Sequence, residues 1–229
     1  WAGIASVQVT LENGTWHMCS GALVSHCWVV TTASCFSGAG AVVQWKVVIG
    51  ARDLAQPGPE AEVFKVKRIV VHHGYVAATA SNNIALLELE QPVECSDYIQ
   101  LGCVPDSALA VPELKTCYMA GWRATPGSAH PEPAPPCCQP GAPSPRAEPC
   151  PGNAGSGGAG TGTAMAAAPD PSLLAQGDTG APLVCKDMDG DYFWLVGLAS
   201  WGEGCACARR PGVFTSTQHF HTWIRAHTG

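Results

Sequence analysis

The chain contains 229 residues, enough to form one all-β unit or two small ones. Its 12 Lys+Arg and 18 Asp+Glu give a formal net charge of −6 at pH 7. Charged residues make up 13% of the chain, against about 25% in ordinary soluble proteins, which argues against a broadly basic nucleic-acid-binding protein. No apolar run approaches the roughly 18 residues of a membrane-spanning helix, so no helical membrane span is expected.

The cysteine content indicates an oxidising, secretory compartment. The sequence has 12 cysteines and an N-G-T glycosylation acceptor at Asn13. A zinc protein is the alternative, but the C-x-C spacing of Cys205 and Cys207 is one that zinc rarely uses. We therefore expect disulfides, and neither a metal nor another cofactor. The chain starts at Trp1 without a signal sequence, as expected of a processed or truncated form.

Short apolar or alternating runs separated by turn residues predict antiparallel strands in an all-β sandwich or barrel. The content of 26 Gly and 19 Pro also suits short strands joined by turns. The runs are residues 4–10, 21–33, 45–49, 63–71, 84–89, 117–122, 182–185, 192–200 and 212–216.

Only the C-terminal residues show a helical pattern. Phe220, Trp223, Ile224 and His227 follow the i, i+3, i+4, i+7 spacing of one helix face. Ser216 and Thr217 precede this face as candidate caps, so a closing helix is expected over residues 217–229.

Residues 123–172 differ in composition from the rest of the chain. They include 12 Pro, 8 Gly and 11 Ala, and no Leu, Ile, Val, Phe, Tyr or Trp. Such a segment cannot bury enough apolar area to offset the roughly 1–2 kcal/mol per residue lost on ordering its backbone. We expect it to be disordered, with Cys137, Cys138 and Cys150 left without an assignable partner.

Several short blocks occur in one order along the chain: CSGALV at 19–24, WVVTTASC at 28–35, SNNIALL at 81–87, CYMAGW at 117–122, QGDTGAPLVC at 176–185, SWG at 200–202 and PGVFT at 211–215. Together they resemble the trypsin-like serine proteases of the chymotrypsin fold. The resemblance covers about residues 1–122 and 173–229. It implies an all-β fold of two antiparallel six-stranded barrels with a C-terminal helix, the second barrel incomplete.

The expected division of the chain follows from this resemblance. Residues 1–105 form the N-terminal barrel, lacking the family's activation terminus, and residues 106–122 form the linker and the first strand of the second barrel. The low-complexity segment 123–172 follows. Residues 173–216 supply the remainder of the second barrel, and residues 217–229 the helix.

The resemblance also places the family's catalytic positions. Ser34 stands at the histidine position, Asn83 at the aspartate position and Thr179 at the serine position. Ser34 has no group that titrates near neutral pH, so it cannot serve as a general base. Thr179 keeps a hydroxyl, but without a base its oxygen is a poor nucleophile. The triad is therefore expected to be degenerate.

Further site residues are implied by the same alignment. The backbone N–H groups of Gly177 and Thr179 occupy the oxyanion-hole positions. Asp178 is the acid that would pair with the activation terminus, which we expect this chain to lack. The specificity pocket is expected to be lined by Leu173 at its base and by Ser200, Trp201, Gly202 and Gly212. Because Leu173 replaces an expected acid, the pocket offers no partner to a cationic substrate group.

Two disulfides, Cys19–Cys35 and Cys117–Cys185, match family bridges. The run 64–69, the terminal run 216–220 and the pair Cys95 and Cys103 are most similar to the acrosins, the sperm acrosomal branch of the family. There this pair would tie down a disulfide-linked light chain. The resemblance further implies an acrosomal or extracellular location and a sulfated glycan or egg-coat glycoprotein as partner. Lys65, Lys67 and Arg68, with His72 and His73, are candidates for the glycan contact, although a solvated strand face is the simpler interpretation.

The sequence leaves three functional hypotheses. The first is a catalytically inactive trypsin-like domain, acrosin-like by descent, with a residual binding role. The second is an acrosin-like endopeptidase that uses Thr179 as its nucleophile. The third is a decayed or mis-assembled chain without a function.

Overall fold

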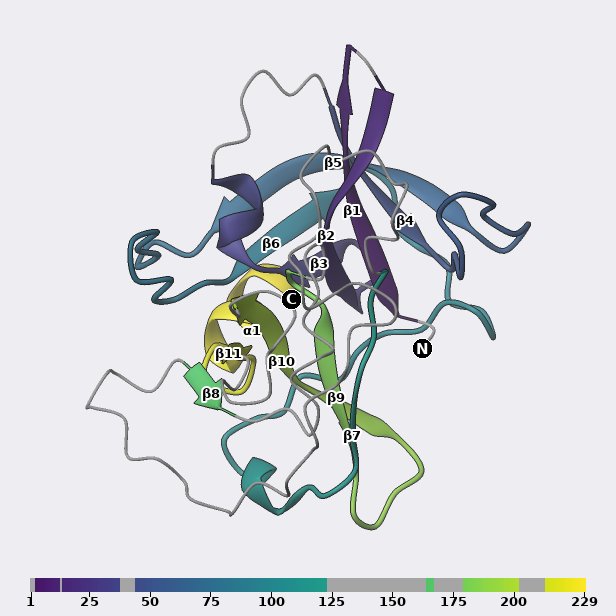
Figure 1. Cartoon of the computed structure of the whole chain (residues 1–229). Coiled ribbons are helices and arrows are strands. Elements are labelled where there is room, and N and C mark those ends of the chain that lie inside the picture. The colour runs from purple at the N-terminus through teal and green to yellow at the C-terminus, as the bar shows by residue number, and fades with distance from the viewer. Residues whose placement is uncertain (1–2, 13, 38–43, 123–163, 167–178, 202–212) are drawn as a thin grey trace, which may run out of the picture.

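The computed structural model describes residues 3–12, 14–37, 44–122, 164–166, 179–201 and 213–229, which form two β assemblies and one short C-terminal helix (Figure 1). The first is a closed barrel in the order β1-β2-β3-β6-β5-β4, and the second a five-stranded sheet in the order β7-β9-β10-β11-β8. All strand pairs are antiparallel. The all-β prediction is confirmed, with a closed six-stranded barrel, a second antiparallel sheet and a C-terminal helix.

The barrel strands are β1 (Ile4–Leu11), β2 (Gly14–Ser25), β3 (Trp28–Thr31), β4 (Gln44–Ile49), β5 (Glu62–Val71) and β6 (Ala85–Leu89). The second sheet contains β7 (Cys117–Met119), β8 (Ala164–Ala166), β9 (Pro182–Lys186), β10 (Phe193–Trp201) and β11 (Val213–Ser216), and the helix is α1 (His221–Thr228). No helix of the described residues is long and apolar enough to cross a membrane.

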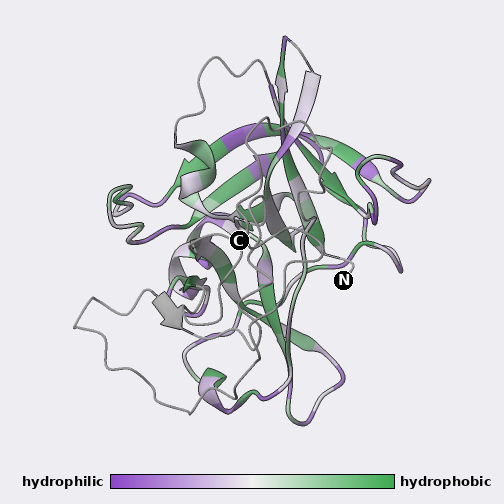
Figure 2. Ribbon diagram, viewed as in Figure 1, coloured by the Kyte–Doolittle hydropathy of each residue, from purple (hydrophilic) through white to green (hydrophobic). Residues whose placement is uncertain are grey.

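The barrel closes around alternating apolar side chains. Ala5, Val7 and Val9 of β1 are buried, and Ala5 and Val7 pack in one core cluster with residues such as Leu23 of β2 and Leu87 of β6. This alternation is what a strand with one face on the core requires. Figure 2 shows hydrophobic segments gathered on the strands, with hydrophilic bands on β5 and in the loops.

Residues 21–33, expected as one run, contain parts of two strands. β2 and β3 form a hairpin in which Ser25 pairs with Trp28 across a turn at His26 and Cys27. This turn carries no Gly, Pro, Asn or Asp, so the usual sequence signal of a hairpin is missing.

Within residues 123–172, only Ala164–Ala166 are described. They form β8 and pair with β11, with Met165 opposite Phe214, so the expectation of disorder does not hold for these three residues. A backbone ladder needs no large side chain, which is why composition did not indicate this strand. The rest of the segment, including Cys137, Cys138 and Cys150, lies outside the described residues.

The helix begins later than expected. Residues 217–220 form a turn, and the N-cap of α1 is Phe220 rather than Ser216 or Thr217. The Thr217 hydroxyl instead donates a hydrogen bond to the carbonyl of Leu195 on β10. Phe220 and Ile224 are buried in a core cluster shared by the barrel and β10, so the apolar face of the helix joins the two assemblies.

Two disulfides occur in the structure, Cys19–Cys35 and Cys117–Cys185, the pairs that the resemblance implies. Cys19 and Cys35 belong to the barrel core, and Cys185 to the core of the second sheet. Of the other described cysteines, Cys95 and Cys103 are exposed and Cys27 is half-buried, and all three are free thiols.

We predict that Leu23→Ala lowers the free energy of unfolding by about 2–5 kcal/mol, because Leu23 is fully buried and its truncation leaves a cavity. Urea titration followed by tryptophan fluorescence measures this loss. Leu101→Ala is the matched control, since Leu101 is 38% exposed, and its effect stays below about 1 kcal/mol. Equal losses in the two variants would contradict the barrel core.

Candidate active site

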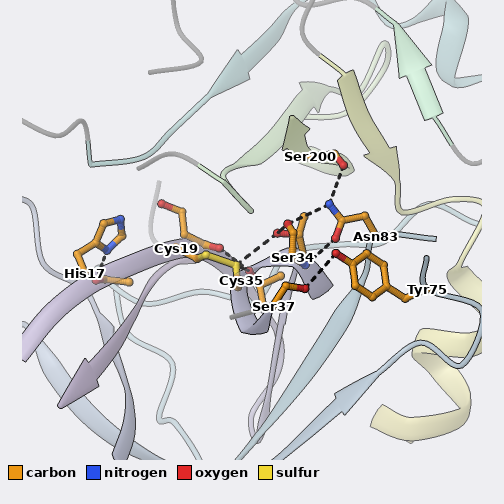
Figure 3. Close-up of a disulfide and its surroundings, with 12 residues drawn as sticks. His17, Cys19, Ser34, Cys35, Ser37, Tyr75, Asn83 and Ser200 are labelled. Carbon is orange, nitrogen blue, oxygen red and sulfur yellow. Dashed lines mark hydrogen bonds between the residues drawn. A yellow bond between two sulfur atoms is a disulfide. The ribbon is translucent and has the colours of Figure 1, made fainter. Parts of the chain in front are cut away.

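Three of the residues singled out from the sequence meet at one point between the barrel and the second sheet (Figure 3). Ser34 lies in a 3-10 helix, Ala33–Phe36, that follows β3, while Asn83 precedes β6 and Ser200 lies on β10. The Ser34 N–H donates to Asn83 Oδ1 at 2.8 Å. The Asn83 Nδ2 group donates to Ser34 Oγ at 3.1 Å and to Ser200 Oγ at 2.8 Å.

The carboxamide of Asn83 is buried, and both its oxygen and its NH₂ group form hydrogen bonds. The residue is 1% exposed, both amide hydrogens are donated, and Oδ1 accepts a hydrogen bond. Its backbone carbonyl accepts from Thr215 Oγ1 of β11 at 3.0 Å. A buried amide satisfied in this way fixes the position of its neighbours.

The strand and disulfide geometry holds Ser34 against Asn83. Cys35 is bonded to Cys19 of β2, and Ser37 Oγ lies 3.2 Å from the hydroxyl of Tyr75. The Ser34 hydroxyl donates to Thr32 Oγ1 at 3.3 Å. The proton of this hydroxyl is therefore directed along its own chain segment.

Thr179 is fixed through its backbone. Its carbonyl accepts from the Ser20 N–H of β2 at 2.9 Å, and the N–H of the following Gly180 donates to Ala199 O at 2.7 Å. Gly180 has φ +82°, and a Cβ there would collide with the Ser20 carbonyl oxygen, so only glycine fits. Among the described residues, the Thr179 side chain forms no hydrogen bond with Ser34, Asn83 or Ser200.

In the described part of the chain, the hydrogen bonds of His17 and His26 involve other residues than Ser34, Asn83 and Thr179. His17 pairs with Ser6 Oγ at 2.7 Å, and in Figure 3 it lies on the other side of the Cys19–Cys35 disulfide from Asn83. His26 lies 2.9 Å from the Val93 carbonyl. No histidine in residues 3–12, 14–37, 44–122 or 213–229 is hydrogen-bonded to Ser34, Asn83 or Thr179. The described residues also contain no group of three His, Cys, Asp or Glu that could hold a metal ion.

Other predicted site positions lie outside the described residues. They are Asn13, Leu173, Gly177, Asp178, Gly202 and Gly212, and of Trp201 only the backbone is described. The oxyanion hole, the activation acid, the glycosylation site and the base of the pocket therefore stay predictions.

The contact between Ser200 and Asn83 was not predicted from the sequence. The Ser200 hydroxyl accepts from Asn83 across 117 residues of chain, and its expected place as a wall of the specificity pocket stays a prediction. Thr215 and Tyr75 were also not indicated. No local pattern signals such long-range partners, because their meeting depends on how the barrel and the sheet pack.

The fold and this site can be compared with known families. The trypsin family model, described as "Trypsin", matches residues 2–224. The chain belongs to the trypsin family. A closed antiparallel barrel, a second antiparallel sheet and a C-terminal helix fit the chymotrypsin fold of that family.

We predict that Asn83→Ala destabilises the fold by about 2–4 kcal/mol, since it removes the acceptor of the buried Ser34 N–H and the donor to Ser200. Asn83→Asp keeps the acceptor and is expected to cost less than Asn83→Ala at pH 7. Chemical denaturation measures both values. Gln100→Ala, which removes an exposed amide, is the control, and a loss below about 0.5 kcal/mol for Asn83→Ala would contradict the bonding described.

Proposed function

We propose that this trypsin-family chain does not hydrolyse peptide bonds and that it acts by binding. The observation that carries the proposal is the hydrogen bond from the Asn83 amide to the Ser34 hydroxyl, at the positions where the family resemblance puts a catalytic aspartate and histidine. A triad needs an imidazole to take the proton of the nucleophile and a carboxylate to hold that imidazole.

The direction of the hydrogen bonds supports this proposal. The Asn83 Nδ2 group donates to Ser34, and the Ser34 hydroxyl donates to Thr32. Neither group can accept a proton from Thr179 near neutral pH, because a hydroxyl and an amide are both very weak bases. Loss of the members of a triad costs roughly a factor of 10⁶ in turnover.

The second candidate is an endopeptidase with Thr179 as its nucleophile. Its activity would need a base from a substrate group or from a residue of the undescribed segments. The backbone bond between Ser20 and Thr179 holds this threonine at the junction of the barrel and the sheet, where an attacking group would have to act.

A fluorophosphonate probe separates these two candidates. We predict no covalent labelling of the folded chain by intact-mass spectrometry, under conditions where active trypsin is labelled completely. Restoring Ser34→His, Asn83→Asp, Thr179→Ser and Leu173→Asp together is also expected to yield no hydrolysis of an arginine amide. Labelling that disappears in Thr179→Ala would instead establish the threonine as a nucleophile.

The surface chosen for binding is the outer face of β4 and β5. Lys46 and Lys65 stand directly opposite each other in the register of these strands, and in the described residues neither forms a salt bridge. Like charges placed opposite each other repel, so a bound polyanion would relieve that repulsion. This supports a sulfated glycan as the ligand of an acrosin-like binding domain.

The neighbouring cations Lys67 and Arg68 are both paired with one acid. Regular strand alternation would put them on opposite faces, but a register shift between Val66 and Arg68 interrupts the ladder. Glu88 consequently bonds both, at 2.6 Å to Lys67 Nζ and 2.8 Å to Arg68 Nη2. The Lys67 hydrogen bond, with help from Arg68, holds the pKa of Glu88 below its ordinary value. Lys67 and Arg68 are thus partly neutralised.

We predict that Lys46→Gln with Lys65→Gln weakens binding to a heparin column or to immobilised heparin about 2–10-fold at low salt, as loss of two exposed ionic contacts implies. Affinity of the unmodified chain should fall steeply as salt rises. Lys186→Gln removes a cation that pairs with Asp191 on the β9–β10 hairpin and is expected to leave binding unchanged. Salt-independent binding would contradict the proposed contact.

The exposed thiols Cys95 and Cys103 support a disulfide-linked light chain as a partner, in the acrosomal vesicle or outside the cell. The remaining hypothesis is a decayed chain without a function. It requires a broad, non-cooperative unfolding curve, whereas a binding domain with a closed barrel requires a sharp one.

A further inference from the structure

A cluster of imidazole rings lies where the end of β5 meets the C-terminal helix. We call it the histidine cluster, and it comprises His72, His73, His219 and His227, packed around Phe220 and Trp223. His72 and His73 stack with ring centroids 4.4 Å apart. The His72 ring also contacts Phe220 at 5.0 Å and Trp223 at 5.1 Å, and Trp223 contacts His227 at 5.0 Å.

His72 is bonded as a neutral ring. The Gly74 N–H donates to His72 Nδ1 at 3.1 Å, so this nitrogen uses its lone pair and the proton of the ring sits on Nε2. Protonation of Nδ1 breaks this bond, because the new Nδ1–H and the Gly74 N–H are both donors and repel each other. It also places a charge against the stacked His73.

The bond at His72 anchors the loop that carries Asn83. The Gly74 carbonyl accepts from Asn82 Nδ2 at 2.7 Å, and the His72 N–H donates to the Ile84 carbonyl at 3.1 Å. Asn82 has φ +51°, a conformation that such contacts must hold in place. Asn83, the next residue, then reaches Ser34 and Ser200.

In the described residues, no carboxylate is ion-paired or hydrogen-bonded to the histidine cluster. Residues 69–87, 213–229, 28–37 and 193–201 contain no Asp or Glu. The acid residue that contacts the turn before α1 is Asp106, whose backbone carbonyl accepts from Gln218 Nε2. The groups facing His72 are His73 from its own loop, His219 from the turn before α1 and His227 from α1. The other ionisable groups nearby in sequence are Tyr75 in the loop and His221 and Arg225 on α1. His72, His73, His219 and His227 form no salt bridge with the described residues.

We propose that protonation of His72 opens the loop of residues 72–83 and releases Asn83 from Ser34 and Ser200, so that the chain changes conformation between neutral and mildly acidic pH. The device is a two-state loop closed by the Gly74–His72 bond, and it is independent of whether the site is catalytic.

The electrostatics give the pH window. Burial, and then His73, His219 and His227, lower the pKa of His72 from its ordinary value of 6.5. An open loop exposes the ring and returns it to that ordinary value, so the open state binds the proton more tightly. The closed loop is therefore fully favoured above pH 6.5, and it is lost progressively as the pH falls below that value.

Hydrogen exchange of the whole chain tests this. The protection factors of the Gly74, Val76 and Ile84 amides, corrected for intrinsic rates, are expected to fall as pH is lowered from 7.5 to 5. Uptake of one proton limits the fall to about tenfold per pH unit. Amides of β1 and β4 should keep their protection, which separates loop opening from acid unfolding. Protection of the loop that does not change with pH would overturn the proposal.

His72→Asn is the key variant, because its side-chain oxygen can accept the Gly74 N–H in an Asx-turn and does not titrate. We expect the pH dependence of the loop to vanish in it and to persist in His26→Asn, which removes an exposed histidine of the β2–β3 turn. An unchanged pH dependence in His72→Asn would refute the assignment. Should that variant fail to fold, NMR titration of the His72 ring in the unmodified chain decides, since its midpoint must coincide with loop opening.

Discussion

The hydrogen bonds of one carboxamide, that of Asn83, connect the parts on which the site depends. Its amide hydrogens reach Ser34 beside the barrel and Ser200 on the second sheet, and its oxygen accepts from the Ser34 N–H. The backbone carbonyl of the same residue accepts from Thr215. Replacing a buried amide that has all of these partners lowers stability, because each partner left without a hydrogen bond is buried away from water and stays unpaired. The arrangement ties the loop after β5 to both assemblies, so the same residue serves packing and site geometry.

Apolar contacts also join the barrel to the second sheet. One core cluster combines Leu86 of the barrel, Leu198 of β10 and Ile224 of α1, so the helix closes the seam between barrel and sheet. Thr179 also lies at this seam, because its carbonyl is bonded to Ser20 of β2. The position of a site at the junction therefore follows from packing alone, and it requires no intact catalytic group to persist.

Much of the fold could be predicted from the sequence where one side chain in two is apolar, as in Val7 and Val9 of β1. Prediction failed where the deciding contact is distant or lies in the backbone. The His26–Cys27 turn lacks the usual turn residues, β8 is recruited by the edge of β11 without large side chains, and Thr217 bonds to Leu195 instead of capping the helix. Motif order singled out Ser34 and Asn83, which the structure brings into hydrogen-bond contact. The bonds of Ser200 and Thr215 to Asn83 depend on packing between distant segments.

The polar groups at Ser34 and Asn83 do not themselves titrate near neutral pH, so the proposed pH response of the loop has a different source, the His72 ring. Ser34, Asn83, Ser200 and Thr179 carry only hydroxyl and amide groups, none of which titrates between pH 5 and 8. Any change of the site in that range must therefore be transmitted from outside it. In the described residues, a bonded connection runs from the His72 ring through Gly74 to Asn82, one residue before Asn83. In the described residues, the bonded group of Ser34, Asn83 and Ser200 can thus depend on an imidazole that lies beside the C-terminal helix.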